Sequence, residues 1–253
     1  MSVRASSNPV VVLGMHRSGT SAITRGLIPL GVALGNDLIP AAFDNVKGFW
    51  EDRQLTEINQ QLQSLMGYEW YGAELSTPID FDAPDVARLY DKALDVLQTK
   101  LGRDVRFAFK DPRTSLVLEF WQSIFERLKL DPAYVIALRN PLDVSRSLKK
   151  RNALELGKSL YLWQNSFLRA LELTKGARRI VVSYEEVLIN PGEELQRISE
   201  RLGLSKAIDG EELDAYQDSF LSQELQHEHS QDSDWTSIAA GFPTVDRLYR
   251  LGR

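Results

Sequence analysis

A glycine loop directly after a short apolar run constrains the fold more than any other feature of this sequence. The run Pro9–Leu13 (PVVVL) is continuous and mostly β-branched, which is typical of a strand buried on both faces. Gly14–Ser21 (GMHRSGTS) follows, and Ser21–Leu30 is predicted to be a helix. Backbone amides in such a loop point at the start of the helix and favour an anion there. The order strand, loop, helix therefore predicts a P-loop-like α/β fold.

Apolar runs and helical patterns continue to alternate along the chain. Further strands are predicted at Val105–Phe109, Ala133–Leu138 and Arg179–Ser183, and helices at Asp52–Met66, at Pro84–Leu101 and from Pro141 onward. This alternation predicts a three-layer fold with a central parallel sheet flanked by helices. No linker-like stretch divides residues 1–253, so we expect a single domain with a cofactor-binding core at about 8–205. The polar stretch 223–253 is expected to form a cap or lid, irregular up to about residue 242.

Charge and composition restrict the partners and the compartment. The net charge of −5 argues against a nucleic-acid polymer or an anionic membrane surface as a partner. The absence of cysteine excludes disulfides, thiolate metal sites and a catalytic thiol. His16, His227 and His229 are the only histidines, so neither a multi-histidine site nor a metal cofactor is expected. No signal peptide or membrane-spanning segment is recognised, which predicts a cytoplasmic protein.

The loop lacks the lysine of the nucleotide-triphosphate pattern G-x-x-x-x-G-K-[ST]. Gly14 and Gly19 keep the spacing, but Thr20 stands in the lysine position. Without that lysine, a magnesium triphosphate loses its main electrostatic clamp, whereas Arg17 offers a forked cationic donor. The loop therefore favours a smaller group, such as a 5′-phosphate that carries one transferable unit. A P-loop kinase that uses ATP and magnesium, with Asp111 as metal ligand, is the main alternative, and a non-catalytic bisphosphate-binding or assembly module is the other.

Three motifs carry a family resemblance. The loop Arg17–Ser21 (RSGTS) follows a buried strand, Arg139 and Ser147 are eight residues apart in RNPLDVSRS, and Tyr184 begins a Tyr-Glu-Glu motif. The chain thereby resembles the sulfotransferases that use 3′-phosphoadenosine 5′-phosphosulfate (PAPS), in their bacterial and carbohydrate-type branch. The resemblance extends from about Val10 to Leu204. It implies PAPS as cofactor, with the 5′-phosphosulfate in the loop, the 3′-phosphate on Arg139 and Ser147, and the adenosine against Tyr184. The implied cofactor-binding residues are His16, Arg17, Ser18, Gly19, Thr20, Ser21, Arg139, Ser147 and Tyr184.

The general base is predicted to be a carboxylate. The run Lys110–Arg113 lacks the histidine that the phenol-type branch carries there, and the resemblance instead implies a glutamate, for which Glu51 is the best match. Its aromatic neighbours are expected to desolvate the carboxylate and raise its pKa. Alternatively, Glu51 and Asp52 only cap and charge the start of the next helix, a role that we favour for Asp52. His16 and Asp111 are the further candidates for the base.

The predicted activity is in-line transfer of a sulfuryl group to a hydroxyl or amine of a carbohydrate or small-molecule acceptor. Lys110 and Arg17 are expected to stabilise the negative charge that develops during transfer. The acceptor pocket is expected to involve Gly35–Tyr71, the region of Trp163 and the stretch around Trp235. The aromatic rings of these segments stack on sugar or aryl faces, or they belong to the core.

Overall fold

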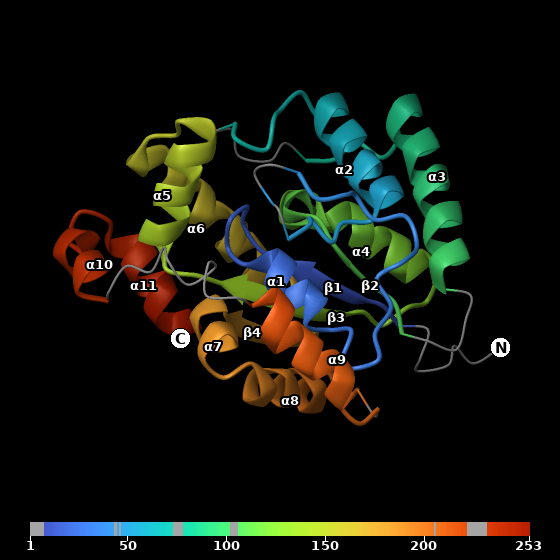
Figure 1. Ribbon diagram of the computed structural model, residues 1–253. Coiled ribbons are helices and arrows are strands. Elements are labelled where there is room, and N and C mark those ends of the chain that lie inside the picture. The colour runs from blue at the N-terminus through green and yellow to red at the C-terminus, as the bar shows by residue number, and fades with distance from the viewer. Residues whose placement is uncertain are drawn as a thin grey trace.

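A computed structural model describes residues 8–42, 45, 47–72, 78–101, 106–204, 206–221 and 232–253. Within these residues, four parallel strands form one sheet in the order β2-β1-β3-β4. The strands are β1 (Val10–Leu13), β2 (Ala108–Lys110), β3 (Ala133–Leu138) and β4 (Arg178–Ser183). Helices lie above and below this sheet in Figure 1, so the predicted three-layer fold is confirmed. The division into domains is not tested by the architecture, and a single domain stays a prediction.

The pairing register brings the carboxyl ends of the strands to one edge of the sheet. Val12 of β1 pairs with Lys110 of β2, and Leu138 of β3 pairs with Ser183 of β4. The glycine loop and the segments that begin at Asp111, Arg139 and Tyr184 all follow these ends. In open α/β sheets, ligands bind at this edge.

The side chains of β1 alternate between two buried clusters, one on each face of the sheet. Val11 and Leu13 belong to the first cluster, and Val10 and Val12 to the second. The first face is covered by α2 (Arg53–Leu65), α3 (Pro84–Leu101), α4 (Leu118–Arg127), α5 (Pro141–Asn152), α6 (Leu156–Leu173), α10 (Asp232–Ala239) and α11 (Pro243–Gly252). The second face is covered by α1 (Thr20–Arg25), α7 (Tyr184–Ile189), α8 (Pro191–Leu202), α9 (Gly210–Asp214) and the π-helix η3 (Ala215–Phe220). All four residues of β1 are fully buried because both faces are covered.

Three segments differ from the prediction. The strand expected at Val105–Phe109 is β2, which runs from Ala108 to Lys110, while Phe107 forms an isolated bridge with Ala33. The first helix ends at Arg25 rather than Leu30, since Gly26 and Pro29 disfavour its continuation and the chain continues in turns. The stretch up to residue 242 is not irregular throughout, because residues 232–239 form α10. Residues 222–231 lie outside the described residues.

The C-terminal helices take part in the core. Trp235 of α10 is buried, as are Val245, Leu248 and Tyr249 of α11, and all four belong to the first-face cluster. Apolar burial of this kind explains why a stretch that is polar overall still folds against α5 and α6. A role as cap or lid stays a prediction. Among the described residues, no helix combines the length and the apolar character that crossing a bilayer requires.

Candidate active site

The glycine loop is folded tightly between β1 and α1. Gly14 donates its N–H to the hydroxyl oxygen of Ser115 at 3.1 Å, and a Cβ there would lie 2.9 Å from the Cβ of Ala137. Arg17 and Gly19 both adopt left-handed backbone conformations, with φ of 70° and 79°. Ser18 and Thr20 are buried within the turn. The close packing explains the glycine at position 14, where any side chain would collide with β3.

Arg17 connects the loop to both residues of the second predicted phosphate motif. Its Nε donates to the hydroxyl oxygen of Ser147 at 2.7 Å, and its carbonyl oxygen accepts from Nη1 of Arg139 at 3.0 Å. Ser147 and Arg139 are buried, and 122 residues or more separate them from Arg17 in the sequence. The fold therefore gathers the predicted 5′ and 3′ phosphate residues into one cluster.

Tyr184 closes this cluster from the other side of the sheet. Its ring lies under the guanidinium of Arg139, 4.7 Å from centroid to Cζ. The same ring fills the space beside Gly19, where a Cβ would overlap it. Two features thus require glycine at position 19: the left-handed φ of its backbone and the closeness of the ring of Tyr184. A contact between Tyr184 and adenosine stays a prediction.

Glu51 and Lys110 form a buried ion pair at the edge of the sheet. Oε1 of Glu51 and Nζ of Lys110 are 2.6 Å apart, and the two residues are 6% and 2% exposed. Burial raises the pKa of Glu51, in the direction predicted, and the attraction of Lys110 opposes that rise. Lys110 also donates to the hydroxyl of Ser21 at 3.3 Å, and this hydroxyl donates to the carbonyl of Phe49 at 3.1 Å. Ser21 therefore ties the glycine loop to the segment that carries Glu51.

The capping role belongs to Asp52. Its Oδ1 accepts the N–H of Leu55 at 3.2 Å, which satisfies a free amide at the start of α2. Its Oδ2 accepts from Nζ of Lys100 at 2.6 Å. Glu51 turns instead toward Lys110, so of the two alternatives only Asp52 caps the helix.

Asp111 is held by a hydrogen-bond network that no sequence motif predicts. Its Oδ2 accepts from the side-chain amide of Asn59 at 3.0 Å, and its Oδ1 accepts from both the backbone and the guanidinium of Arg113. Asn59 in turn accepts the indole N–H of Trp121 at 2.7 Å. The backbone bond from Arg113 starts the 3₁₀-helix η2 (Pro112–Leu116). The signal for this network was Asn59 itself, a polar residue on the apolar face of α2, next to Ile58.

His16 lies on the outer side of the loop, against the indole of Trp70. The two ring centroids are 4.1 Å apart, and Nε2 of His16 is buried with no hydrogen-bond partner in the described part of the chain. Burial is the largest cause that holds the pKa of His16 well below its usual value of 6.5. The cations Arg113, Arg151, Lys110 and Arg17 lower this pKa further, in that order. His16 is therefore neutral at pH 7, and the other two histidines lie outside the described residues.

The aromatic residues expected around the acceptor differ in how deeply they are buried. Trp163 and Trp235 are buried in the core, and the indole N–H of Trp163 donates to the carbonyl of Arg139. Trp50 packs edge-on against Phe220 of η3. In the turn after α2, the ring of Tyr71 packs edge-on against Trp70, which contacts His16 of the loop, and Tyr71 is 42% exposed. The core explanation thus holds for Trp163 and Trp235, and Phe43 lies outside the described residues.

Two solved structures share this architecture. One is the sulfotransferase domain of the olefin synthase of Synechococcus PCC 7002, with a TM-score of 0.55 and 19% identity over 96% of this chain and 94% of that one. The other is a sulfotransferase domain of the curacin biosynthetic pathway, with a TM-score of 0.54 and 16% identity over 96% of both chains. This chain has the sulfotransferase fold. The sequence matches no family model and no curated protein.

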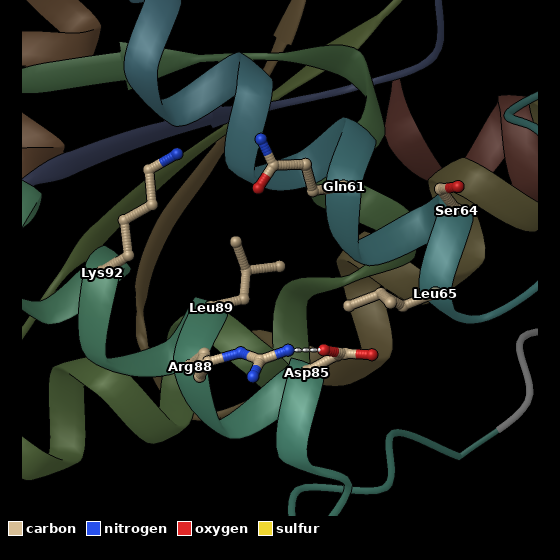
Figure 2. A pocket seen from close by; sticks show the side chains of 7 residues that line it. All are labelled: Gln61, Ser64, Leu65, Asp85, Arg88, Leu89 and Lys92. Atoms are coloured by element: carbon tan, nitrogen blue, oxygen red, sulfur yellow. Dashed lines mark hydrogen bonds and ion pairs between the residues drawn. The ribbon is translucent and has the colours of Figure 1, made fainter.

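A separate cavity of about 480 Å³ lies between α2 and α3, away from the glycine loop of the sulfotransferase fold. Figure 2 shows its lining, in which Leu65 and Leu89 face polar side chains and Arg88 pairs with Asp85. None of the predicted catalytic or cofactor-binding residues lines it, although Gln61, Ser64 and Leu65 belong to the segment Gly35–Tyr71 that was expected near the acceptor. The candidate active site is therefore the loop cluster at the edge of the sheet, and not this cavity.

Proposed function

We propose that this chain is a sulfotransferase that moves a sulfuryl group from PAPS to a hydroxyl or amine of a carbohydrate or small-molecule acceptor. The observation that carries the proposal is the contact of Arg17 with both Ser147 and Arg139 in a chain of sulfotransferase fold. A nucleotide that bears phosphate at two positions needs two neighbouring anion sites, and this cluster offers cationic donors for both.

The chemistry of the donor set fits such a nucleotide. Arg17 and Arg139 carry permanent positive charge in a forked geometry that matches phosphate and sulfate oxygens. In the proposal, Arg17 and the loop amides hold the 5′-phosphosulfate, and Arg139 and Ser147 hold the 3′-phosphate. PAPS supplies the sulfuryl group and leaves as adenosine 3′,5′-bisphosphate.

Glu51 is the proposed general base. It accepts the proton that the acceptor hydroxyl loses as its oxygen bonds to sulfur. A carboxylate with a raised pKa is a stronger base than an ordinary one, and burial raises the pKa of Glu51. Lys110, 2.6 Å from Glu51, stabilises the negative charge on the departing phosphate oxygen, and Arg17 stabilises the charge on the sulfuryl oxygens.

The kinase alternative has less support. Both oxygens of Asp111 accept hydrogen bonds, from Asn59 and Arg113, so its carboxylate already has structural partners. Thr20 also occupies the position of the lysine that clamps a triphosphate. A non-catalytic bisphosphate-binding module would use the same anion cluster. It would differ from the proposed enzyme only because it transfers no sulfuryl group.

A thermal-shift experiment separates the nucleotide-binding functions. The melting temperature of the full chain is measured with adenosine 3′,5′-bisphosphate in EDTA and with adenosine 2′,5′-bisphosphate in EDTA, a control of equal charge. It is also measured with ATP plus magnesium. We expect the 3′,5′-isomer to raise the melting temperature most, because only it presents phosphates at both predicted positions. Stabilisation by magnesium–ATP alone would overturn the proposal.

A second step distinguishes enzyme from binding module. Transfer of radiolabelled sulfuryl from PAPS into a fractionated cell extract is measured with the wild-type chain and with Arg139→Ala. Labelled product that depends on Arg139 supports the enzyme. Tight binding of the bisphosphate without any labelled product would support the module.

A further inference from the structure

A strained turn of the backbone directly precedes Glu51. Trp50 adopts a left-handed conformation with a φ of 56°. Such a conformation costs free energy in any residue that has a Cβ, so it persists only where its surroundings hold it in place. The backbone is fixed on both sides of Trp50. The carbonyl of Phe49 accepts from the hydroxyl of Ser21 at 3.1 Å, and the carbonyl of Glu51 accepts the N–H of Ile39 at 2.8 Å. The turn therefore determines where the carboxylate of Glu51 lies.

The ring of Trp50 is held from two sides. Phe220 of η3 packs edge-on, with its ring centroid 5.8 Å away and an angle of 78° between the two planes. The guanidinium carbon of Arg25, at the end of α1, lies 5.6 Å from the ring centroid, and Nη2 of Arg25 is paired with Glu212 of α9 at 2.9 Å. Edge contacts between rings and contacts between a cation and a ring both depend on the orientation of the ring. Together they fix the half-buried indole in one place.

The π-helix η3 is itself anchored to α1. The ring of Tyr216 stacks on Phe220 with the two centroids 5.9 Å apart, and its hydroxyl donates to the carbonyl of Ala22 at 2.9 Å. Tyr216 is fully buried. Figure 1 shows α9, which continues into η3, beside α1. The support of the Trp50 ring is thus tied to the helix that follows the glycine loop, and π-helical turns are frequent at functional sites.

Hydrogen bonds also connect the turn to η3. The indole N–H of Trp50 donates to the carbonyl of Lys47 at 2.9 Å. Nζ of Lys47 donates in turn to the carbonyl of Ser219 at 2.8 Å. The chain from residue 47 to residue 51 is therefore bound to η3 both through the ring of Trp50 and through its own lysine.

We propose that Trp50 is a positioning residue, whose ring contacts fix the turn that directs the carboxylate of Glu51 to Lys110. The inference rests on the proposed function, in which Glu51 is the general base, and it adds η3 and the end of α1 to the parts of the chain on which the base depends. A displacement of about 1 Å at a reacting group can cost about 10²-fold in rate, so the position of a base is as important as its identity. A tryptophan ring also binds sugar and aryl faces, and direct contact with the acceptor is the competing explanation.

The energetic coupling between Glu51 and Lys110 reports the position of the carboxylate without any ligand. It is obtained from urea denaturation at pH 7 of wild type, Glu51→Gln, Lys110→Met and the double variant, and of the same four proteins with Trp50→Leu added. Leucine keeps an apolar side chain and removes the ring. We expect the coupling in the Trp50→Leu background to fall below about half of its wild-type value, because a carboxylate that has moved away no longer offsets the charge of Lys110. Equal coupling in the two backgrounds, or no coupling in either, would overturn the inference.

Three further variants separate positioning from a general loss of stability. Trp50→Phe keeps a ring between Phe220 and Arg25 and should retain more than about half of the coupling. Trp235→Leu is the matched control, since the indole N–H of Trp235 is also hydrogen-bonded but its ring belongs to the first-face cluster. It should lower the stability and keep the coupling. If Trp50→Leu does not fold, Phe220→Leu replaces it and should lower the coupling in the same direction. Coupling as low in Trp50→Phe as in Trp50→Leu, or equally low in Trp235→Leu, would contradict the assignment.

Kinetics distinguish positioning from contact with the acceptor. Transfer of radiolabelled sulfuryl from PAPS is followed at increasing amounts of the extract fraction that accepts it. With Trp50→Leu, turnover at saturation should fall by about 10–10²-fold, while the amount of fraction that gives half of the maximal rate changes little. A larger half-saturating amount at unchanged turnover would mean that the ring binds the acceptor, and the inference would be wrong.

The two proposals fail in different ways. If Trp50→Leu lowers the coupling but Glu51→Gln transfers sulfuryl groups at the wild-type rate, Trp50 positions Glu51 and the proposed base is wrong. If Glu51→Gln loses turnover but the coupling is unchanged in Trp50→Leu, the base stands and the positioning role is wrong. If no transfer is found at all, the coupling still decides the positioning role, because it is measured without substrate.

Discussion

Replacing Glu51 by glutamine tests what the buried pair with Lys110 contributes to stability and to catalysis. Glutamine keeps the shape of the side chain and its acceptor oxygen, but it removes the negative charge. Lys110 is 2% exposed, so its ammonium would stay in a site that water does not reach, without a counter-charge. We therefore expect Glu51→Gln to unfold more easily than wild type.

The magnitude follows from the burial of both partners. Removing one partner of a buried pair costs about 3–5 kcal/mol, because the other charge is left uncompensated. The hydrogen bond that glutamine still accepts from Lys110 offsets about 1 kcal/mol. The expected loss in the free energy of unfolding is therefore about 2–4 kcal/mol. Lys110→Met should cost a similar amount, since it leaves the carboxylate alone.

The double variant makes the test decisive. With Glu51→Gln and Lys110→Met together, neither charge is present, so the combined loss should be smaller than the sum of the single losses by about 2 kcal/mol or more. Urea denaturation at pH 7 of the four proteins measures the difference. Losses that add to within about 0.5 kcal/mol would refute the coupling, and with it the geometry of the pair.

The same substitution tests the general base. At a temperature where the variant is folded, turnover should fall by about 10²–10⁴-fold, because no group accepts the proton. The wild-type rate should fall as the pH drops through the pKa of Glu51, which burial raises above the ordinary 4.5. The rate of Glu51→Gln should not show this fall at low pH, the acid limb of the pH–rate profile. If the limb persists, the base is another residue, and His16 and Asp111 are tested next.

Three further substitutions address the anion cluster. Arg139→Ala should weaken binding of adenosine 3′,5′-bisphosphate by about 1.5–3 kcal/mol in calorimetry, and unchanged affinity would remove the 3′-phosphate assignment. Arg17→Ala should lower turnover more than it lowers bisphosphate affinity, since its charge is needed most during transfer, and equal losses would mean that it only binds. Gly19→Ala should lower the melting temperature, because the new Cβ overlaps the ring of Tyr184 at a left-handed φ. Adding Tyr184→Ala should recover part of that loss, and a Gly19→Ala chain that melts like wild type would disprove the close packing.

Elements with strong local patterns were predictable from the sequence. The helix Pro84–Leu101 and the strand Ala133–Leu138 have the predicted bounds, since the first has a clear helical period and the second is a continuous apolar run. The helix after the loop was predicted too long because its apolar residues continue beyond Gly26, and burial of those residues does not require a helix. The local pattern of apolar residues predicts whether an element is a helix or a strand better than it predicts the residue at which the element ends.

The sequence predicted that Arg17, Arg139 and Ser147 lie together at one edge of the sheet, but it did not predict their contacts. The motifs indicated Arg17, Arg139 and Ser147 together, because each follows a buried strand of one parallel sheet. No sequence pattern indicated that Arg17 would touch both of the others, or that Glu51 would meet Lys110 from 59 residues away. Such contacts depend on the register of the sheet and the path of the loops, which are set by packing of the whole chain.

Helix α5 connects the anion cluster to the turn after α2. Its start is capped by Asn140, directly after Arg139, and its second turn carries Ser147 against Arg17. One turn later, Arg151 reaches the ring of Trp70. A small shift of this one helix, caused by a bisphosphate on Arg139, would therefore reach the turn that carries Trp70 as well. If an acceptor binds beside this turn, its affinity should depend on whether the bisphosphate is bound, and by linkage the affinity for the bisphosphate should change by the same factor when the acceptor is bound.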